Sequence, residues 1–238
     1  MNKYDKISNL LTKTKNNIMK TSRIKIQRLS KFLFSESDKS IPGYSFYKLK
    51  LSLQVKSLFM FEKNFKLHKE DRALLLILYC YFIQDQNAGA IIGLDINKGL
   101  LISGPVGCGK TTLMNLMPSS NWNKIKYEII PARNIVNDFN EAGFEVLEKY
   151  KDTQDYCFDD LGLELTGCHN TTDCNVMEEI LLSRCDLFKT KNVKTHITTN
   201  LNIEELEARY GSQFMSRLDE MFNLISFAKS SKDKRIWD

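Results

Sequence analysis

Residues 104–112 read GPVGCGKTT and contain the spacing G-x-x-x-x-G-K-[ST]. Glycines in such a stretch let the backbone turn tightly, so that successive N–H groups can point at phosphate oxygens. Lys110 would then reach the β- and γ-phosphates of a nucleoside triphosphate, and the Thr111 hydroxyl would ligate Mg²⁺. The pattern therefore predicts a phosphate-binding loop formed by Gly104, Pro105, Val106, Gly107, Cys108, Gly109, Lys110, Thr111 and Thr112.

A second chemical feature is the pair of acids in YCFDDLG, residues 156–162. Asp159 follows three apolar residues, which is the position of an acid that holds Mg²⁺ at the end of a strand. Asp160 lies where many ATPases carry a glutamate that acts as general base. Because aspartate is one methylene shorter, the attacking water must approach more closely or hydrolysis will be slow. The alternative is two acids that cap a turn.

Two polar residues later in the chain complete the candidate site. Asn200 ends the apolar stretch THITTN and could position the attacking water near the γ-phosphate, although Asn after a strand is also a common helix cap. Arg217 lies near the end of a predicted helix. A rigid arginine at a protomer edge could enter a neighbouring site and stabilise the transferring phosphoryl group. The alternative for Arg217 is a surface ion pair with Asp219 or Glu220, which would contribute little.

These residues need elements that bring them together, and the apolar pattern after residue 65 supplies them. It predicts a helix near 70–84 and then alternating strands and helices. The strands are expected at 99–103, 126–130, 155–159, 195–199 and 223–228, and the helices at 110–117, 132–150, 174–188 and 203–219. Short strands separated by helices of this length predict an α/β fold, with a five-stranded parallel sheet covered on both faces.

The apolar run ALLLILYCYFI at 73–83 is too short to cross a bilayer, and its charged flanks favour a buried helix. No signal peptide is recognised, and the six cysteines show no paired secretory spacing. We therefore expect a cytoplasmic protein with reduced thiols and no membrane association. Cys168, His169 and Cys174 lie close together in CHNTTDC, but the pattern lacks a further ligand pair and is expected to be a polar loop.

Charge is concentrated at the N-terminus. Residues 1–34 hold nine Lys or Arg and one acid in a chain of net charge +5, so the remainder is net acidic. Such an arm favours a polyanion such as DNA, or else a helical region that docks a protein partner. A transit peptide is a further alternative. Residues 35–45 form a plausible linker, and residues 46–64 are ambiguous between helix and strand.

Taken in order, several segments resemble the AAA+ ATPases of the DnaC and IstB group, which are bacterial helicase loaders and transposition ATPases. They are KGLLISGPVGCGKTTLM, YCFDDLGLE, NVMEEILLSRCDLF, KTHITTNLNIEELEARYGSQFMSRLDEM and DKRIWD. The resemblance implies a P-loop NTPase fold of the ASCE type. It also implies that Lys110 and Thr111 are the Walker A pair, Asp159 and Asp160 the Walker B pair, Asn200 sensor 1, and Arg217 the arginine finger.

The chain departs from this family in places. Gln213 stands where family members commonly carry a further arginine, four residues before the finger. Arg184 matches a recurrent arginine for which we assign no role. We expect no full helical lid after the last strand, so the usual sensor 2 arginine is lacking unless Lys234 or Arg235 replaces it. By resemblance, Phe65 and Leu67 lie against the adenine.

The resemblance implies an ATPase that uses ATP and Mg²⁺, forms a homo-oligomer on binding ATP, and acts with DNA, expected to be single-stranded. Its partner would be a replicative helicase or a transposase. We expect a basic N-terminal region at 1–64 and an AAA+ domain at 65–238. The alternatives are a P-loop small-molecule kinase and a nucleotide-gated adaptor with little turnover.

Overall fold

The structure, a computed structural model, describes residues 46–62, 68, 71–118, 125–231 and 233–234. Its centre is a five-stranded sheet in the order β2-β3-β6-β1-β7, and every neighbouring pair is parallel. The predicted parallel sheet is therefore confirmed. Its strands are β1 (Gly99–Ser103), β2 (Glu128–Pro131), β3 (Tyr156–Leu161), β6 (Thr195–Thr199) and β7 (Phe222–Ser226).

The strands form because their apolar residues are buried on both faces of the sheet. Leu100 and Ile102 of β1 belong to one hydrophobic cluster, whereas Leu101 between them belongs to the other. This alternation follows from the two-residue period of a strand. Helices must therefore cover both sides, and they do.

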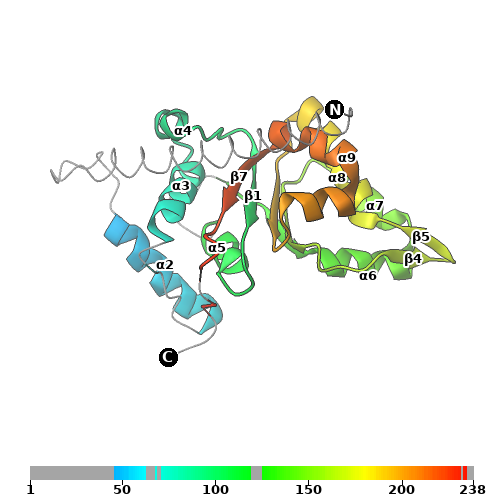
Figure 1. The fold of residues 1–238 in the computed structure, drawn as a ribbon, viewed down its shortest axis with the longest axis horizontal. Helices are drawn as coiled ribbons and strands as arrows, with labels where there is room; N and C mark the ends of the chain where they lie inside the picture. The colour runs from blue at the N-terminus through cyan, green and yellow to red at the C-terminus, as the bar shows by residue number, and fades with distance from the viewer. Residues whose placement is uncertain (1–45, 63–67, 69–70, 119–124, 232, 235–238) are drawn as a thin grey trace, which may run out of the picture.

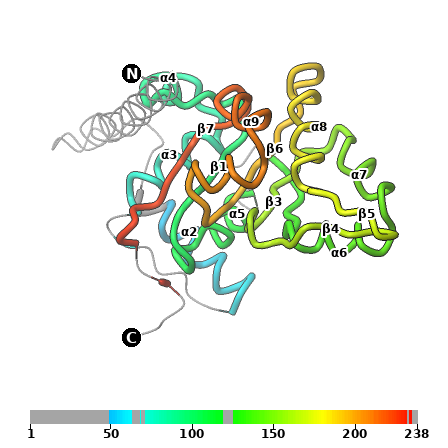
Figure 2. The backbone as a smooth tube through the Cα atoms, turned by 45° about the vertical axis from the view of Figure 1, so that its right-hand side comes forward, coloured from blue at the N-terminus to red at the C-terminus, as the bar shows by residue number. Residues whose placement is uncertain are grey.

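Helices lie on both sides of the sheet (Figures 1 and 2), in two groups that belong to the two hydrophobic clusters. The first group is α2 (Phe46–Phe61), α3 (Arg72–Phe82), α4 (Gln86–Ile92) and α5 (Lys110–Leu116). The second is α6 (Ala132–Ala142), α7 (Glu145–Lys149), α8 (Val176–Lys191) and α9 (Ile203–Met221). The carboxyl ends of the parallel strands thus share one edge between two helical layers.

The apolar run at 73–83 forms most of α3, as predicted, and its leucines are buried against the sheet. Tyr81 on this helix donates a hydrogen bond of 2.6 Å to the carbonyl of Lys98, just before β1. The part of the chain that the structure describes contains no helix long and apolar enough to span a bilayer.

Several elements differ from the sequence-based expectation. Within the ambiguous stretch at 46–64, Phe46–Phe61 form α2, and α4 was not predicted. The expected helix at 132–150 is divided into α6 and α7 because Gly143 adopts φ +72° and ψ −145°, outside the helical region. Helix α9 has a similar interruption at Gly211, where φ is +75° and ψ is 163°.

The stretch CHNTTDC forms a β-hairpin rather than the expected polar loop. Strands β4 (Gly167–His169) and β5 (Thr172–Cys174) pair antiparallel. Between them Asn170 and Thr171 have φ of +49° and +66°. Two consecutive left-handed residues match the right-handed twist of a tight two-residue hairpin, which explains why this polar segment becomes a pair of strands.

Some predictions concern residues outside the described part of the chain. They are the basic arm at 1–34, the linker at 35–45, and the roles of Phe65, Leu67 and Arg235. The division at residue 64 stays a prediction. Leu49 and Leu53 of α2 are buried in the same cluster as residues of α3 and α5.

Candidate functional site

The predicted phosphate loop connects β1 to α5. Gly104 donates its backbone N–H to the carbonyl of Thr199 at 3.2 Å, so the loop starts beside the end of β6. Gly107 and Gly109 have φ of +78° and +100°, which favours glycine at both positions. Gly109 is also the N-cap of α5, and the N–H groups at a helix start favour an anion.

Lys110 and Asn200 meet at this loop although they are 90 residues apart. The Lys110 ammonium donates to the Asn200 Oδ1 at 2.5 Å and to the carbonyls of Gly104 and Pro105 at 2.9 and 3.0 Å. Lys110 is only 4 % exposed. The side chain is therefore fixed at the carboxyl ends of β1 and β6.

Thr111 and Asp159 form the second half of the site. Oδ1 of Asp159 accepts hydrogen bonds from the hydroxyls of Thr111 at 2.9 Å and Thr198 at 2.6 Å. Burial raises the pKa of the Asp159 carboxyl above its usual value, and the hydrogen bonds from the two threonines partly oppose this effect. A hydroxyl and a buried carboxylate that converge in this way suit Mg²⁺, because the cation would favour the ionised acid.

Asp160 is held differently from Asp159. Its φ is +55°, and the pairing of β3 with β6 is irregular between Phe158 and Leu161. Its backbone N–H donates to the Thr198 hydroxyl at 2.9 Å. The irregularity turns the chain so that Asp159 is buried whereas Asp160 is half-buried. A non-glycine residue in this conformation is uncommon and is retained where surrounding contacts enforce it.

Thr198 is a site residue that the sequence analysis did not identify. It is fully buried, donates to Asp159 and accepts from Asp160, so one hydroxyl orients both acids. Its position in the sequence could have indicated this role, because Thr198 lies two residues before Asn200 on the strand next to the acids.

Arg217 lies apart from these residues. Its Nη1 is 3.3 Å from Oδ1 of Asp186 on α8, and its side chain is one-third exposed. Among the described residues, the Arg217 side chain contacts α8 and does not contact the phosphate loop. The alternative ion pairs with Asp219 or Glu220 are not formed, because Arg217 pairs with Asp186 and Glu220 pairs with Lys189 at 2.8 Å.

Arg184, which had no assigned role, is completely buried. Its guanidinium donates hydrogen bonds to one hydroxyl and four carbonyls, at 2.8 to 3.3 Å: Thr195, Tyr150, Asp152, Gln154 and Lys194. These acceptors lie before or at the amino ends of β3 and β6, opposite the phosphate loop. Arg184 therefore joins two strand starts and lies at the end of the sheet opposite the candidate site.

The loop after the acids is attached to α9 by another group that the sequence analysis missed. Glu164 is 4 % exposed and accepts from the N–H of Gly162 at 2.8 Å and from Arg209 Nε at 3.3 Å. The hydroxyl of Tyr210 also donates to the Glu164 carboxylate. Glu164 thereby links the segment that follows Asp160 to the helix that carries Arg217.

Lys234, one of the two residues named as a replacement for a sensor 2 arginine, lies near the loop. Its ammonium is 2.7 Å from Oδ2 of Asp71, and both side chains are buried. Its backbone N–H donates to the carbonyl of Gly107 at 2.9 Å. The ammonium of Lys234 therefore forms an ion pair with Asp71.

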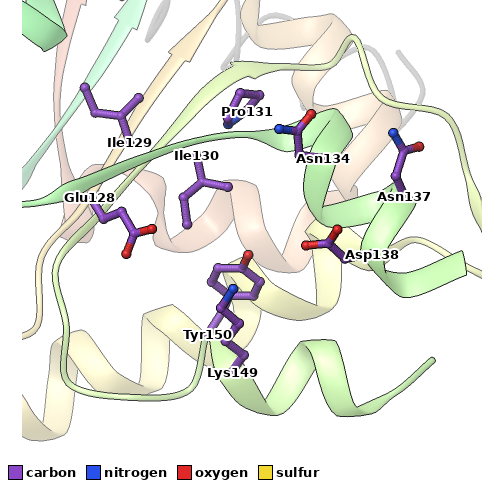
Figure 3. Close-up of a pocket in the computed structure, with 9 residues that line it drawn as sticks. All are labelled: Glu128, Ile129, Ile130, Pro131, Asn134, Asn137, Asp138, Lys149 and Tyr150. Atoms are coloured by element: carbon purple, nitrogen blue, oxygen red, sulfur yellow. The ribbon is translucent and has the colours of Figure 1, made fainter. Parts of the chain in front are cut away.

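A separate cavity of about 360 Å³ lies at the edge strand β2 (Figure 3). In Figure 3 the carboxylates of Glu128 and Asp138 lie near the ring of Tyr150. Burial, Asp138 and Glu128 raise the pKa of Tyr150 to about 12. The phosphate loop contributes none of the lining residues, which are Glu128, Ile129, Ile130, Pro131, Asn134, Asn137, Asp138, Lys149 and Tyr150.

Comparison with solved structures identifies similar folds. The DnaC helicase loader superposes with a TM-score of 0.51 at 18 % identity, over 71 % of this chain and 95 % of that chain. DnaI gives a TM-score of 0.52 at 14 % identity, over 71 % of this chain and 90 % of that chain. No protein-family model and no curated protein matches the sequence. The structural likeness shows that this chain shares its fold with these two proteins.

Proposed function

We propose that this chain binds ATP with Mg²⁺ at the phosphate loop and hydrolyses it. One observation carries the proposal: Lys110 contacts Asn200, and Thr111 contacts Asp159, at one edge of the sheet. The four residues come from α5 and from the ends of β3 and β6. Their convergence supplies a cation, a metal-binding pair and a polar amide around the anion-binding start of a helix.

Each residue has a defined task in this mechanism. The loop N–H groups bind phosphate oxygens, and Lys110 moves from its carbonyl acceptors to the β- and γ-phosphates. Thr111 and Asp159 would hold Mg²⁺, which supplies charge neutralisation to the phosphates when bound. Asp160 accepts a proton from the attacking water, and Asn200 orients that water. Thr198 positions both acids through its hydroxyl.

Hydrolysis would be completed by Arg217 from a neighbouring protomer. Within one protomer its guanidinium pairs with Asp186, and this exposed pair is weak enough to exchange for a phosphoryl group. Glu164 attaches the segment after Asp160 to the part of α9 that precedes the interruption at Gly211, and Arg217 lies in the part that follows it. We therefore propose that the protein assembles as a homo-oligomer when ATP is bound.

The biological role that suits this fold is helicase loading. The similar solved structures include the DnaC helicase loader, and the basic arm at 1–34 fits either single-stranded DNA or a replicative helicase. A transposition ATPase would share the same core and differ in its partner. Purification of the complex from the native cell, followed by identification of the bound protein, separates a helicase from a transposase.

A nucleotide-gated adaptor is the second candidate. The observation that favours it is Asp160, which has a shorter side chain than glutamate and lies in a constrained backbone conformation with φ of +55°. If its carboxylate cannot reach the water, ATP would be bound and released with little turnover. ATP affinity would then be ordinary, but the hydrolysis rate would be very low even with partners present.

The test is ATP hydrolysis with Mg²⁺ over a range of protein concentrations, with and without single-stranded DNA. We expect turnover per protomer to rise with concentration and with DNA. Lys110→Ala should weaken ATP binding about 100-fold or more, because it removes a buried cation at the phosphates. Lys151→Ala, in an exposed ion pair with Glu148, is the matched control. Equal ATP binding by wild type and Lys110→Ala would refute the proposal.

A further inference from the structure

The end of the described chain packs against the phosphate loop. After β7, the N–H of Phe227 donates to the carbonyl of Ser103 at 2.9 Å, and the N–H of Lys234 donates to the carbonyl of Gly107 at 2.9 Å. These two bonds attach the chain to the start and the middle of the β1–α5 connection. We call residues 227–231 with 233–234 the tail strap.

The contact between the tail strap and the loop is tight. A Cβ atom added to Gly104 would lie 2.7 Å from Cβ of Phe227, and one added to Gly107 would lie 2.0 Å from Oδ1 of Asp233. Real Cβ atoms essentially never approach other atoms so closely. Gly104 and Gly107 are therefore in direct contact with the strap, through Cβ of Phe227 and through the carboxylate end of the Asp233 side chain.

A buried ion pair fastens the strap to α3. Oδ2 of Asp71, at the start of α3, lies 2.7 Å from the Lys234 ammonium, and the side chains are 2 % and 3 % exposed. The same Oδ2 accepts the N–H of His68 at 3.0 Å. The ammonium also lies 5.1 Å from the centre of the Phe227 ring. Removing two charges from water is costly, so such a pair is retained only with good geometry and added contacts.

We propose that Asp71 and Lys234 are positioning residues for the nucleotide site, because their ion pair holds the tail strap against Gly104 and Gly107. The inference rests on the proposed ATP binding at this loop. A loop held in its binding conformation loses less conformational freedom when the triphosphate arrives. The pair therefore acts on ATP affinity through the loop, and it does not itself touch the phosphates.

The experiment compares Lys234→Met, Asp71→Asn and the double variant Asp71→Asn/Lys234→Met. Each single change leaves a buried charge without its partner and should lower Tm strongly. The double variant has no unpaired charge, so its Tm should return close to that of the wild type. Its ATP Kd should nevertheless remain at least tenfold weaker, because the strap is no longer fastened. Lys234→Arg keeps the positive charge, so its ATP Kd should be close to that of the wild type.

The matched control is Lys189→Met, which breaks the exposed pair of Lys189 with Glu220 and should change neither Tm nor Kd appreciably. A double variant with wild-type Tm and wild-type ATP affinity would show that the pair is structural only, and would overturn the inference while leaving ATP binding intact. A wild-type chain that does not bind ATP would overturn both proposals.

A second measurement does not depend on the folding of any variant. In the wild-type chain, ATP should slow amide hydrogen exchange of the tail strap, since a bound triphosphate restrains the loop that the strap contacts. The expected change is at least severalfold at residues 227–234 and smaller at α7, which lies on the other face of the sheet. Unchanged exchange in the strap at saturating ATP would contradict the inference.

Discussion

Oγ1 of Thr111 lies 2.9 Å from Oδ1 of Asp159, although 48 residues separate them in the chain. The contact exists because β1 and β3 are parallel and both deliver their following residues to the same edge of the sheet, on either side of β6. It places a hydroxyl from the start of α5 against a buried acid. Together with the Lys110–Asn200 contact, it brings four residues that are distant in the sequence to one end of the sheet.

Thr198→Val tests the hydroxyl that bridges the acids. The substitution keeps the shape of the side chain, but it removes the acceptor of the Asp160 N–H and one donor to Asp159. An unsatisfied buried N–H costs about 1–3 kcal/mol, so we expect a lower free energy of unfolding and at least a tenfold loss of turnover. Urea unfolding and steady-state hydrolysis measure these effects. Thr190→Val, on the exposed side of α8, is the control, and a Thr198→Val enzyme with full turnover would exclude Thr198 from the site.

Asp159→Asn should stabilise the chain while it removes activity. The pKa of Asp159 is raised in the folded state, so the folded protein holds this proton more tightly than the unfolded chain. Ionisation of Asp159 therefore costs stability at neutral pH, and this cost disappears as the pH falls through the folded pKa toward the unfolded value. We expect the Tm of Asp159→Asn to exceed that of the wild type at pH 7 and the difference to shrink at low pH. Hydrolysis should fall about 100-fold or more. A lower Tm at pH 7 would contradict this interpretation.

Arg217→Ala and Asp160→Asn test whether active sites are shared between protomers. Arg217→Ala should bind ATP normally but lose about 10³-fold in turnover, which is the effect of removing an arginine finger. Asp160→Asn should also be inactive alone. Mixing the two variants creates some sites with an intact Asp160 and an intact Arg217 from the neighbour, so partial activity should return. Absence of rescue at every mixing ratio would argue against action between protomers.

Deletion of residues 1–34 tests whether the basic arm binds DNA. If its lysines and arginines neutralise phosphates, the slope of log K against log salt for single-stranded DNA should become flatter by about 0.7 for each phosphate that the arm no longer neutralises. Fluorescence anisotropy at several salt concentrations measures this slope. ATP affinity of the truncated chain serves as the control for an intact site. An unchanged slope would assign the arm to a protein partner instead.

His196 predicts a specific dependence of stability on pH. Burial, with nearby Lys194 and Arg184, lowers its pKa to about 3. The unfolded chain takes up this proton near pH 6.5, whereas the folded chain does not, so the stability present above pH 6.5 is lost as the pH falls toward 3. The loss approaches about 1.4 kcal/mol per pH unit below pH 6. In His196→Asn, whose amide oxygen can still accept the N–H of Leu100, the curve of Tm against pH should be flatter between pH 6.5 and 4.5. Parallel curves for the two proteins would contradict this assignment.

Local patterns in the sequence were sufficient for the sheet and most of its helices. The stretches at 99–103 and 195–199 are strands with the predicted bounds. In the first, burial on both faces leaves a continuous apolar signal, whereas the second, THITT, is rich in β-branched residues that favour strands. The structure of short polar segments was harder to predict from the sequence. The hairpin at Asn170 and Thr171 depends on two left-handed residues, and neither is the glycine that usually indicates such a turn.

The sequence by itself predicted the phosphate loop, the five strands of the parallel sheet in chain order, and the residues Lys110, Thr111, Asp159 and Asn200 that the sheet brings together. These depend on local spacing and on the rule that parallel strands end at one edge. Only the tertiary structure decided that Thr198 bridges the acids, that Arg184 joins two strand starts, and that Lys234 pairs with Asp71. These contacts join segments that are far apart in the sequence, and they form because a buried polar group needs a hydrogen-bond partner in the folded structure. Residue spacing along the chain does not indicate which partner that will be.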